Sequence, residues 1–352
     1  MYVEELKHKS EWEQFLQTCP NATFYHSPQW KQVLEQSFTR PLYLAVRNEN
    51  GTLVAMCPGF ILNSGIGKIY QSTPRSDYAG PIIVDHCLDC APQSLLKYIQ
   101  SYCSNNHIAY AKVCLTENLP KMVFRSPAMF SESSGGVVEI NLKATPSHHL
   151  WNKVFSSSLR KRISRIERNG FQAQEAKTKS DFREFYALYA QNMKYIGASP
   201  FSYEFMENAW NLLYPDKLRV WLAGKNKIIA GIAVLKYGQG TYVSYTGIDR
   251  KLSHTYSVNP YLVWHEIKKA EEEGCQLVSL GSTSSNPRET HHLQKIELGG
   301  LFRKQTTVWY PFNFVGQSLL LCRIKTVNAW KNIRDFLPQS LKRGLEKRLS
   351  IF

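Results

Sequence analysis

Three residues in the second half of the chain have side chains suited to charge neutralisation and proton transfer. Lys295 follows a polar loop, residues 281–292, and its ammonium group can neutralise an oxyanion or a phosphate. Tyr245 and Asp249 lie at and after the end of a predicted strand, where they can relay a proton from an ammonium group. We predict these three residues as the catalytic set, with Lys295 first. The ordinary alternatives are a solvated lysine and a packed tyrosine.

A second set of cations lies on a predicted helix, residues 151–168, whose apolar positions face inward. Lys161, Arg165 and Arg168 share one face at helical spacing, a stripe that suits a phosphate backbone or a pyrophosphate. We predict that Arg160 belongs to the same phosphate-binding set. The alternative is a solvated helix face.

The distribution of charge supports an anionic partner for the second half of the chain. Residues 1–150 hold 12 basic and 12 acidic side chains, whereas residues 151–322 hold 23 and 14, and residues 323–352 hold 8 and 2. A basic excess of this kind attracts anions. The expected partners of this part of the chain are therefore anionic; DNA is not expected among them.

The elements that must position Lys295 have clear boundaries. Asn259 and Pro260 are typical of a helix start, and Gly274 is typical of the position just after a helix end. A short apolar run, residues 276–281, follows and is typical of a buried strand. Strand, helix, strand and polar loop in this order indicate an α/β enzyme that binds its ligand at the strand ends.

The same order of elements occurs twice in the chain. Each half begins with helices, continues with a hairpin and a third strand, and then has a helix between strands; the hairpin strand at Leu42–Val46 aligns with Leu218–Leu222. We predict a mixed-sheet α/β (α+β) fold made by tandem duplication. The expected domains are residues 1–145, 146–315 and a basic tail, 316–352.

The tail interleaves apolar and basic residues from 323 to 352, a pattern typical of a helix on an anionic membrane surface; a helix docked on the second domain is the alternative. We find no transmembrane run and no signal peptide, so we expect a cytoplasmic protein, peripheral at the inner face of the membrane. Cys87 and Cys90 have the spacing of a metal or redox pair, but their surroundings favour reduced thiols, and no metal is expected.

Residues 156–312 resemble the FemAB and FemX proteins, which are acyl- or aminoacyltransferases with two GNAT-like domains, and the related BioF2-type acetyltransferases. The residues that carry the resemblance are Ser158–Ile163, Asp181–Phe182 with Phe185–Tyr186, Val258–Trp264, and Lys295 with Gly299. Gln294 and Leu298 replace the aromatic residues of the family's signature around this lysine.

The resemblance implies a donor site at the start of the helix at Pro260. Coenzyme A-dependent GNAT enzymes bind pyrophosphate there through a glycine-rich turn, but residues 250–256 contain no glycine. The departure favours aminoacyl-tRNA, the donor of FemX-like proteins, over acyl-CoA; no tightly bound cofactor is expected. We assign His254, Tyr256 and Asn259 to the donor side, and the first two also lie within reach of the acceptor.

The resemblance also implies an acceptor pocket in the first half of the chain, to which it assigns four residues, with two more from the loop before Lys295. The assigned residues are His26, Trp30, Asp77, Tyr78, Arg288 and His291.

Three hypotheses follow. The first is an aminoacyl- or acyltransferase acting on an amine of a small or lipid-linked anionic precursor, as in the peptidoglycan and cell-wall biogenesis that the family implies. The second is an acyl-CoA-dependent GNAT N-acetyltransferase acting on an amino sugar or polysaccharide precursor. The third is a non-catalytic protein that binds RNA or anionic lipid.

Overall fold

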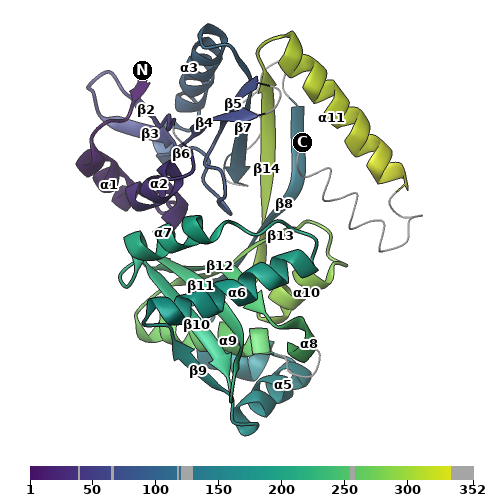
Figure 1. Cartoon of the computed structure of the whole chain (residues 1–352). Helices are drawn as coiled ribbons and strands as arrows, with labels where there is room; N and C mark the ends of the chain where they lie inside the picture. Colours follow the sequence, from purple (N-terminus) through teal and green to yellow (C-terminus); the bar gives the residue numbers. More distant parts are fainter. Residues whose placement is uncertain (39, 65–66, 117–118, 120–129, 254–257, 334–352) are drawn as a thin grey trace. The chain divides into compact units, whose positions relative to one another are not determined.

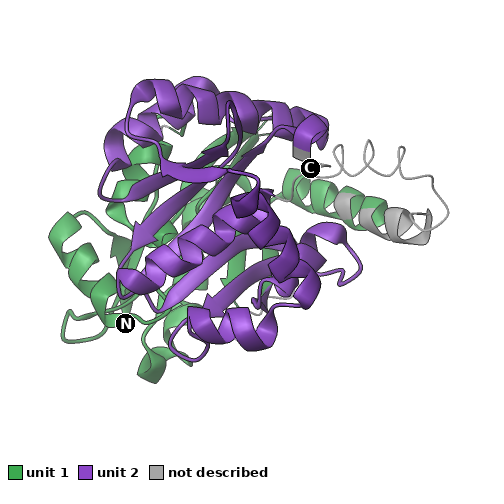
Figure 2. Ribbon diagram, turned by 90° about the horizontal axis from the view of Figure 1, so that it is seen from below, with its two compact units in different colours: residues 1–134, 305–352 green, residues 135–304 purple. Residues whose placement is uncertain are grey.

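The computed structural model describes the chain except for residues 39, 65–66, 117–118, 120–129, 254–257 and 334–352 (Figure 1). It divides into two compact units, coloured separately in Figure 2. Unit 1 contains residues 1–134 and 305–352, and unit 2 contains residues 135–304. The predicted mixed α/β architecture is confirmed.

Unit 1 contains short strands, and its helix α2 (Pro28–Glu35) has a side-chain cap. Ser27 caps the second helix by accepting a hydrogen bond from the Trp30 amide, with Pro28 in the first turn. The elements of unit 1 are β1 (Tyr2–Glu5), α1 (Lys9–Thr18), η1 (Phe24–His26), α2 (Pro28–Glu35), β2 (Leu44–Arg47), β3 (Leu53–Cys57), β4 (Phe60–Ser64), β5 (Gly67–Gln71), β6 (Ile82–Ile83), η2 (Asp85–Cys87), α3 (Ala91–Asn105), β7 (Ile108–Thr116) and α11 (Phe314–Ile333).

The strands of unit 1 form two sheets because the chain turns between β3 and β4. One sheet has the order β1-β2-β3-β6, and in the other β5 lies between β4 and β7. Pro58 and Gly59 separate β3 from β4, and a side chain at Gly59 would collide with the ring of Tyr70. Strands β5 and β7 are parallel, with α3 as the connection between them.

Unit 2 repeats this plan with longer elements. Strands β8 and β14 each begin in one unit and end in the other. The elements that complete the chain are β8 (Phe130–Asn141), α4 (Ser147–His149), η4 (Leu150–Val154), α5 (Ser157–Arg168), β9 (Gln172–Glu175), α6 (Lys179–Tyr195), α7 (Tyr203–Leu213), β10 (Leu218–Gly224), β11 (Ile228–Tyr237), β12 (Gly240–Ile248), α8 (Arg250–Ser253), α9 (Val258–Glu272), β13 (Leu277–Ser284), α10 (Thr290–Glu297) and β14 (Leu301–Pro311).

The sheet of unit 2 has the order β8-β13-β12-β11-β10-β9. All of its neighbouring pairs are antiparallel except β12 and β13, which are parallel and connected through α9. Apolar residues of α5 and α9 pack with the sheet in one core, which includes Leu159, Ile163, Leu262 and Ile267. This burial is what holds the two helices on the sheet.

The predicted duplication is confirmed by the equal order of elements in the two units. In each unit a strand, two helices and a hairpin lead to a parallel strand pair joined by a helix. The sequence did not predict β1 or β9, because these four-residue edge strands carry little apolar alternation. The predicted helix 151–168 was wrong as one element: the chain leaves the helical path at Phe155, and Ser156 caps a new helix, α5.

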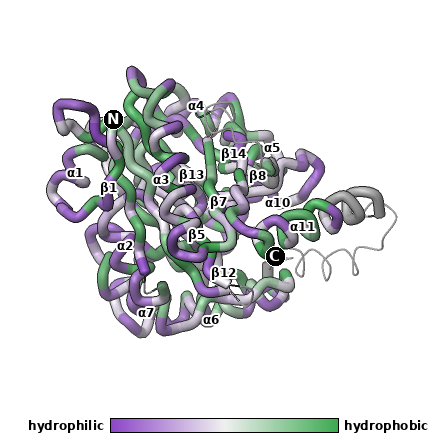
Figure 3. Tube along the Cα trace, turned by 90° about the horizontal axis from the view of Figure 1, so that it is seen from above, coloured by the Kyte–Doolittle hydropathy of each residue, from purple (hydrophilic) through white to green (hydrophobic). Residues whose placement is uncertain are grey.

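The last described element is the helix α11, and the first half of this helix is largely hydrophobic (Figure 3). Phe314 is 81% exposed, whereas Gly316 approaches the Ala109 carbonyl so closely that a side chain there would collide with it. Within the described residues, no helix is long and apolar enough to cross a bilayer. The tail prediction for residues 334–352 lies outside the described residues, and the predicted boundaries at 145 and 315 stay predictions.

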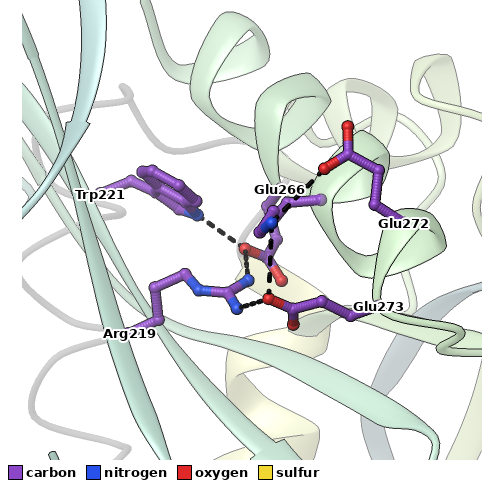
Figure 4. A network of polar contacts seen from close by, with 6 residues as sticks. Arg219, Trp221, Glu266, Glu272 and Glu273 are labelled. Carbon is purple, nitrogen blue, oxygen red and sulfur yellow. Dashed lines mark hydrogen bonds and ion pairs between the residues drawn. The ribbon is translucent and has the colours of Figure 1, made fainter. Parts of the chain in front are cut away.

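A buried charge network ties α9 to the hairpin strand β10 (Figure 4). Arg219 is 3% exposed and contacts Glu266, which is 0% exposed, at 3.2 Å, and it also pairs with Glu273. The Trp221 indole donates a 2.6 Å hydrogen bond to Glu266 Oε2. Burial raises the pKa of Glu266, and the Arg219 charge and the indole hydrogen bond act against that rise.

We expect Arg219→Ala to reduce the free energy of unfolding by about 3 kcal/mol, because it leaves the buried Glu266 carboxylate without its cation. Urea denaturation measures the change. Lys269→Ala is the matched control: Lys269 pairs with Glu272 and Glu273 in more exposed surroundings, so its removal should cost less than about 1 kcal/mol. Equal losses in the two variants would contradict a buried anchor.

Candidate active site

The parallel strands β12 and β13 are paired only at their beginnings. Gly240–Tyr242 pairs with Leu277–Ser279, after which the two strands pair with their other neighbours, β11 and β8. Each strand has a bulge just beyond the paired stretch. Ser244 is the extra residue of β12 opposite β11, and Leu280 with Gly281 opposes a single residue of β8. Bulges bend strands, so the ladder between β12 and β13 ends here, and we call the unpaired part of these two strands the opening.

Lys295 is attached to the edge of this opening. It lies on α10, and its Nζ donates a 2.7 Å hydrogen bond to the carbonyl oxygen of Ser282 in β13. One turn earlier, buried His292 donates through Nδ1 to the Ser284 carbonyl at 2.9 Å. Two side chains of α10 are therefore hydrogen-bonded to the carbonyls of Ser282 and Ser284 near the end of β13.

Two glycines set the position of α10 on the sheet. Gly299 ends the helix with a φ of +84°, a conformation that other residues adopt only with strain. At Gly300 a side chain would collide with Val138 of β8. This explains why the sequence pattern pairs Lys295 with Gly299: the glycines allow the helix carrying the lysine to approach the strand closely.

A second cation, Arg250, lies at the end of β12 in a fixed orientation. Its Nε donates to Asn192 Oδ1 at 2.7 Å, and its guanidinium lies over the ring of Tyr195 at 5.4 Å. Buried Asn192 in turn donates from its amide nitrogen to the Thr246 carbonyl at 2.9 Å. The helix α6 thus attaches Arg250 to the separating part of β12.

His291 lies close to both cations. Its pKa is lowered from the ordinary value, first by desolvation and then by the positive charges of Lys295 and Arg250. The side chain keeps a solvent-exposed surface, so screening limits the size of the shift while its direction follows from the two charges. The imidazole is therefore neutral at pH 7 and can accept a proton.

The other two predicted catalytic residues make structural contacts. Tyr245 is half-buried, and its ring packs edge-on against Tyr189 and Phe201 at 5.7 and 5.8 Å. Asp249 Oδ1 accepts hydrogen bonds from the backbone amides of Lys251 and Leu252, which caps the short helix α8. Their catalytic roles stay predictions, and the structure gives each a local structural function.

The predicted phosphate-binding set is divided. Arg160 donates to the Trp151 carbonyl at 2.8 Å and so closes the break before α5, while Lys161 is exposed. Arg165 and Arg168, at the end of α5, line an open pocket of about 670 Å³. Its opposite wall is the β10–β11 hairpin.

The remaining donor-side residues surround the start of α9. Asn259 is half-buried, and its Oδ1 is buried without a hydrogen-bond partner among the described residues. The helix begins at Val258, so Asn259 lies inside it rather than at its cap. His254 and Tyr256 lie outside the described residues.

The predicted acceptor residues of unit 1 cluster between η1, α2 and the loop of residues 72–80. His26 and Trp30 are both 0% exposed. His26 Nε2 donates to the Gly80 carbonyl at 3.1 Å while Nδ1 accepts from the Thr23 amide at 3.0 Å, and burial lowers its pKa to about 4. Two further side-chain bonds complete the cluster: Trp30 to Ser76 at 2.7 Å, and Tyr25 to Asp77 at 2.8 Å.

Of this acceptor set, only Asp77 keeps a partly exposed surface, since Tyr78 is also buried. Because His26 and Trp30 are buried, they could affect an acceptor only by positioning the loop of residues 72–80, to which they are hydrogen-bonded. In unit 2, exposed Arg288 lies in the turn before α10, where its amide donates to Asn286 Oδ1 at 3.1 Å. The acceptor assignments stay predictions.

Sequence reasoning missed four residues of these sites. Asn192 and Arg250 are far apart in the chain and isolated in type, so only their 2.7 Å hydrogen bond identifies them. Lys225 and Lys227 lie in the turn of the β10–β11 hairpin, and they line the pocket beside Arg165 and Arg168. The described residues contain no cluster of three or more potential metal ligands.

Comparison with known proteins agrees with this geometry. Residues 154–286 match the sequence model of the Acetyltransferase (GNAT) domain. The fold is similar to that of FemX, with a TM-score of 0.70 and 11% identity over 87% of this chain and 97% of that chain. No curated protein matches the chain by sequence.

Two further solved structures share the fold at low identity. L-PGS from Bacillus licheniformis has a TM-score of 0.57 and 11% identity over 98% of each chain. A tandem GNAT protein from the clavulanic acid biosynthesis pathway has a TM-score of 0.55 and 11% identity over 88% of this chain and 98% of that chain. At these identities the likeness describes the fold and leaves the substrate open.

We expect Lys295→Met to raise the pKa of His291, because it removes one of the two charges that disfavour the imidazolium. NMR titration of the His291 ring measures the change. Lys179→Met, which removes an exposed lysine at the start of α6, should leave that pKa unchanged. An unaltered His291 titration in Lys295→Met would contradict the electrostatic coupling.

Proposed function

We propose that this chain is a GNAT-type acyltransferase with a FemX-like fold, and that it transfers an aminoacyl group from aminoacyl-tRNA to an amine of an anionic precursor. The observation that carries the proposal is the position of Lys295. Its ammonium group lies at the opening between β12 and β13, where Nζ donates a hydrogen bond to the Ser282 carbonyl. A donor carbonyl entering the opening can replace that oxygen.

Lys295 and His291 can support separate steps of the transfer. When the acceptor amine attacks the donor ester carbonyl, negative charge develops on the carbonyl oxygen, and Lys295 can stabilise it. His291, neutral because of its lowered pKa, can take the proton that the attacking ammonium must lose. The C–N bond forms and the ester C–O bond breaks; the imidazolium of His291 then returns its proton to the leaving ribose oxygen, and the nitrogen loses its second proton to solvent.

The chemistry of the loop after β12 supports an RNA donor. Residues 250–256 contain no glycine, so this segment lacks the residue type that lets backbone amides wrap a pyrophosphate closely. Arg250 provides a side-chain cation there instead, fixed by its hydrogen bond to Asn192. A side-chain cation suits a phosphodiester, which is bound mainly through charge.

The proposed acceptor is an amine on an anionic, cell-envelope-type precursor, small or lipid-linked. The supporting observation is that two cationic side chains, Lys295 and Arg250, both lie close to His291. A phosphorylated or carboxylated acceptor would gain favourable electrostatic energy on approaching them.

A second candidate is transfer from acyl-CoA to an amino sugar. The match of residues 154–286 to the Acetyltransferase (GNAT) domain favours it. The two candidates differ in the donor and share the same use of Lys295.

We expect Lys295→Met to lower kcat by about 10²-fold or more, by analogy with the loss of a single oxyanion-stabilising group. Parallel assays with aminoacyl-tRNA and acyl-CoA, using a cell-envelope precursor fraction as acceptor, measure the transfer. Lys179→Met is the matched control and should retain full activity.

Transfer from aminoacyl-tRNA alone would support the proposal. Transfer from acyl-CoA alone would replace it with the second candidate. Wild-type turnover by Lys295→Met with either donor would remove Lys295 from the mechanism.

A further inference from the structure

The open pocket at the end of α5 is strongly cationic. Four of its lining side chains are basic, Arg165 and Arg168 from α5 and Lys225 and Lys227 from the β10–β11 hairpin, and none of its lining residues is acidic. Across the described part of the chain, none of these four side chains forms an ion pair. Four like charges gathered without counter-charges create a positive potential that favours a polyanion.

The two walls are held together by a side-chain contact and by a strand pairing. Gly170 ends α5 with a φ of +80°, and the Lys225 side chain lies 3.5 Å from the point where a Cβ on Gly170 would be. On the other side, Gly224 pairs with Gln172 of β9, which joins the hairpin to the strand that follows α5. The fold therefore sets the backbone positions of the four residues that carry these cations.

The pocket is also connected to the opening that carries Lys295. Leu252 lines the pocket and belongs to α8, the short helix that begins with Arg250. Arg250 in turn lies close enough to His291 to lower its pKa. A ligand that extends from the pocket along α8 can therefore reach Arg250.

We propose that this pocket binds the phosphodiester backbone of an RNA donor next to its reactive end. The inference rests on the proposed function, in which the donor is aminoacyl-tRNA, and it names the surface that recognises the RNA. The pocket volume of about 670 Å³ is in the range that accommodates a ligand of nucleotide size. Its cations are exposed on flexible stems at an open surface, as suits phosphate contacts that position a backbone without reading bases.

Binding of uncharged tRNA, measured by fluorescence anisotropy between 50 and 300 mM salt, tests the proposal without requiring activity. We expect Lys225→Gln with Lys227→Gln to weaken binding about tenfold and to reduce the slope of log affinity against log salt by about 1.4 to 1.8, the value for two lost phosphate contacts. Lys177→Gln with Lys179→Gln neutralises two exposed lysines elsewhere in unit 2 and should change neither quantity.

Transfer assays complete the test. The same double variant should raise KM for aminoacyl-tRNA about tenfold, as the loss of two phosphate contacts predicts. We expect kcat to be nearly unchanged, because Lys295 is not among the residues that line the pocket. Unaltered RNA affinity and salt slope in the double variant would overturn the inference. So would an equal rise in KM for acyl-CoA, which would assign the pocket to coenzyme A phosphates.

The outcomes for the proposed function are separate. If the wild-type protein binds tRNA with the expected salt dependence and the double variant does not, but no aminoacyl transfer occurs, the RNA surface stands and the proposed donor is wrong. If wild-type protein transfers from aminoacyl-tRNA while the pocket lysines have no effect on RNA affinity, the proposed function stands and this surface is wrong.

Discussion

The geometry of unit 2 depends on how soon the parallel pairing of β12 and β13 ends. Three residues of each strand form the ladder, and the bulges at Ser244 and at Leu280–Gly281 then turn the strands toward different neighbours. If the ladder continued, its backbone groups would be satisfied and the sheet would be closed at this point. Ending it early creates a place where a substrate can lie between strands.

Helices supply the charged groups around that opening, each from a different direction. α10 brings Lys295 and His291 to β13, while α6 brings Asn192, which holds Arg250 at the end of β12. α9 connects the two strands and is bound to β10 by the Arg219–Glu266 pair. The rigidity of the site therefore comes from several anchored elements, consistent with catalytic groups that must keep a fixed spacing.

Much of this could be predicted from the sequence, because the relevant signals are local. The helix end before Gly274, the strand at residues 276–281 and the duplication all follow from spacing and residue type, and they match the structure. Lys295 was identified through its spacing to Gly299, and the structure supplies the reason in the close approach at Gly300.

The contacts between distant residues could not be predicted in this way. Nothing near Asn192 in the sequence indicates that it bridges Thr246 and Arg250, and His26 and Trp30 look like pocket residues until their burial is known. Asp249 is a similar case, since a carboxylate after a strand is equally typical of catalysis and of a helix cap. In each case the role of the residue depends on tertiary contacts, which the sequence pattern does not predict.

The contact of Gly300 with Val138 has an evolutionary implication. Because Gly300 leaves no room for a Cβ against the Val138 side chain, the height of α10 above the sheet, and with it the position of the ammonium group, depends on a glycine at this one point. Lineages sharing this architecture could diversify the β13–α10 turn, and with it the molecules they accept, while the lysine stays in place.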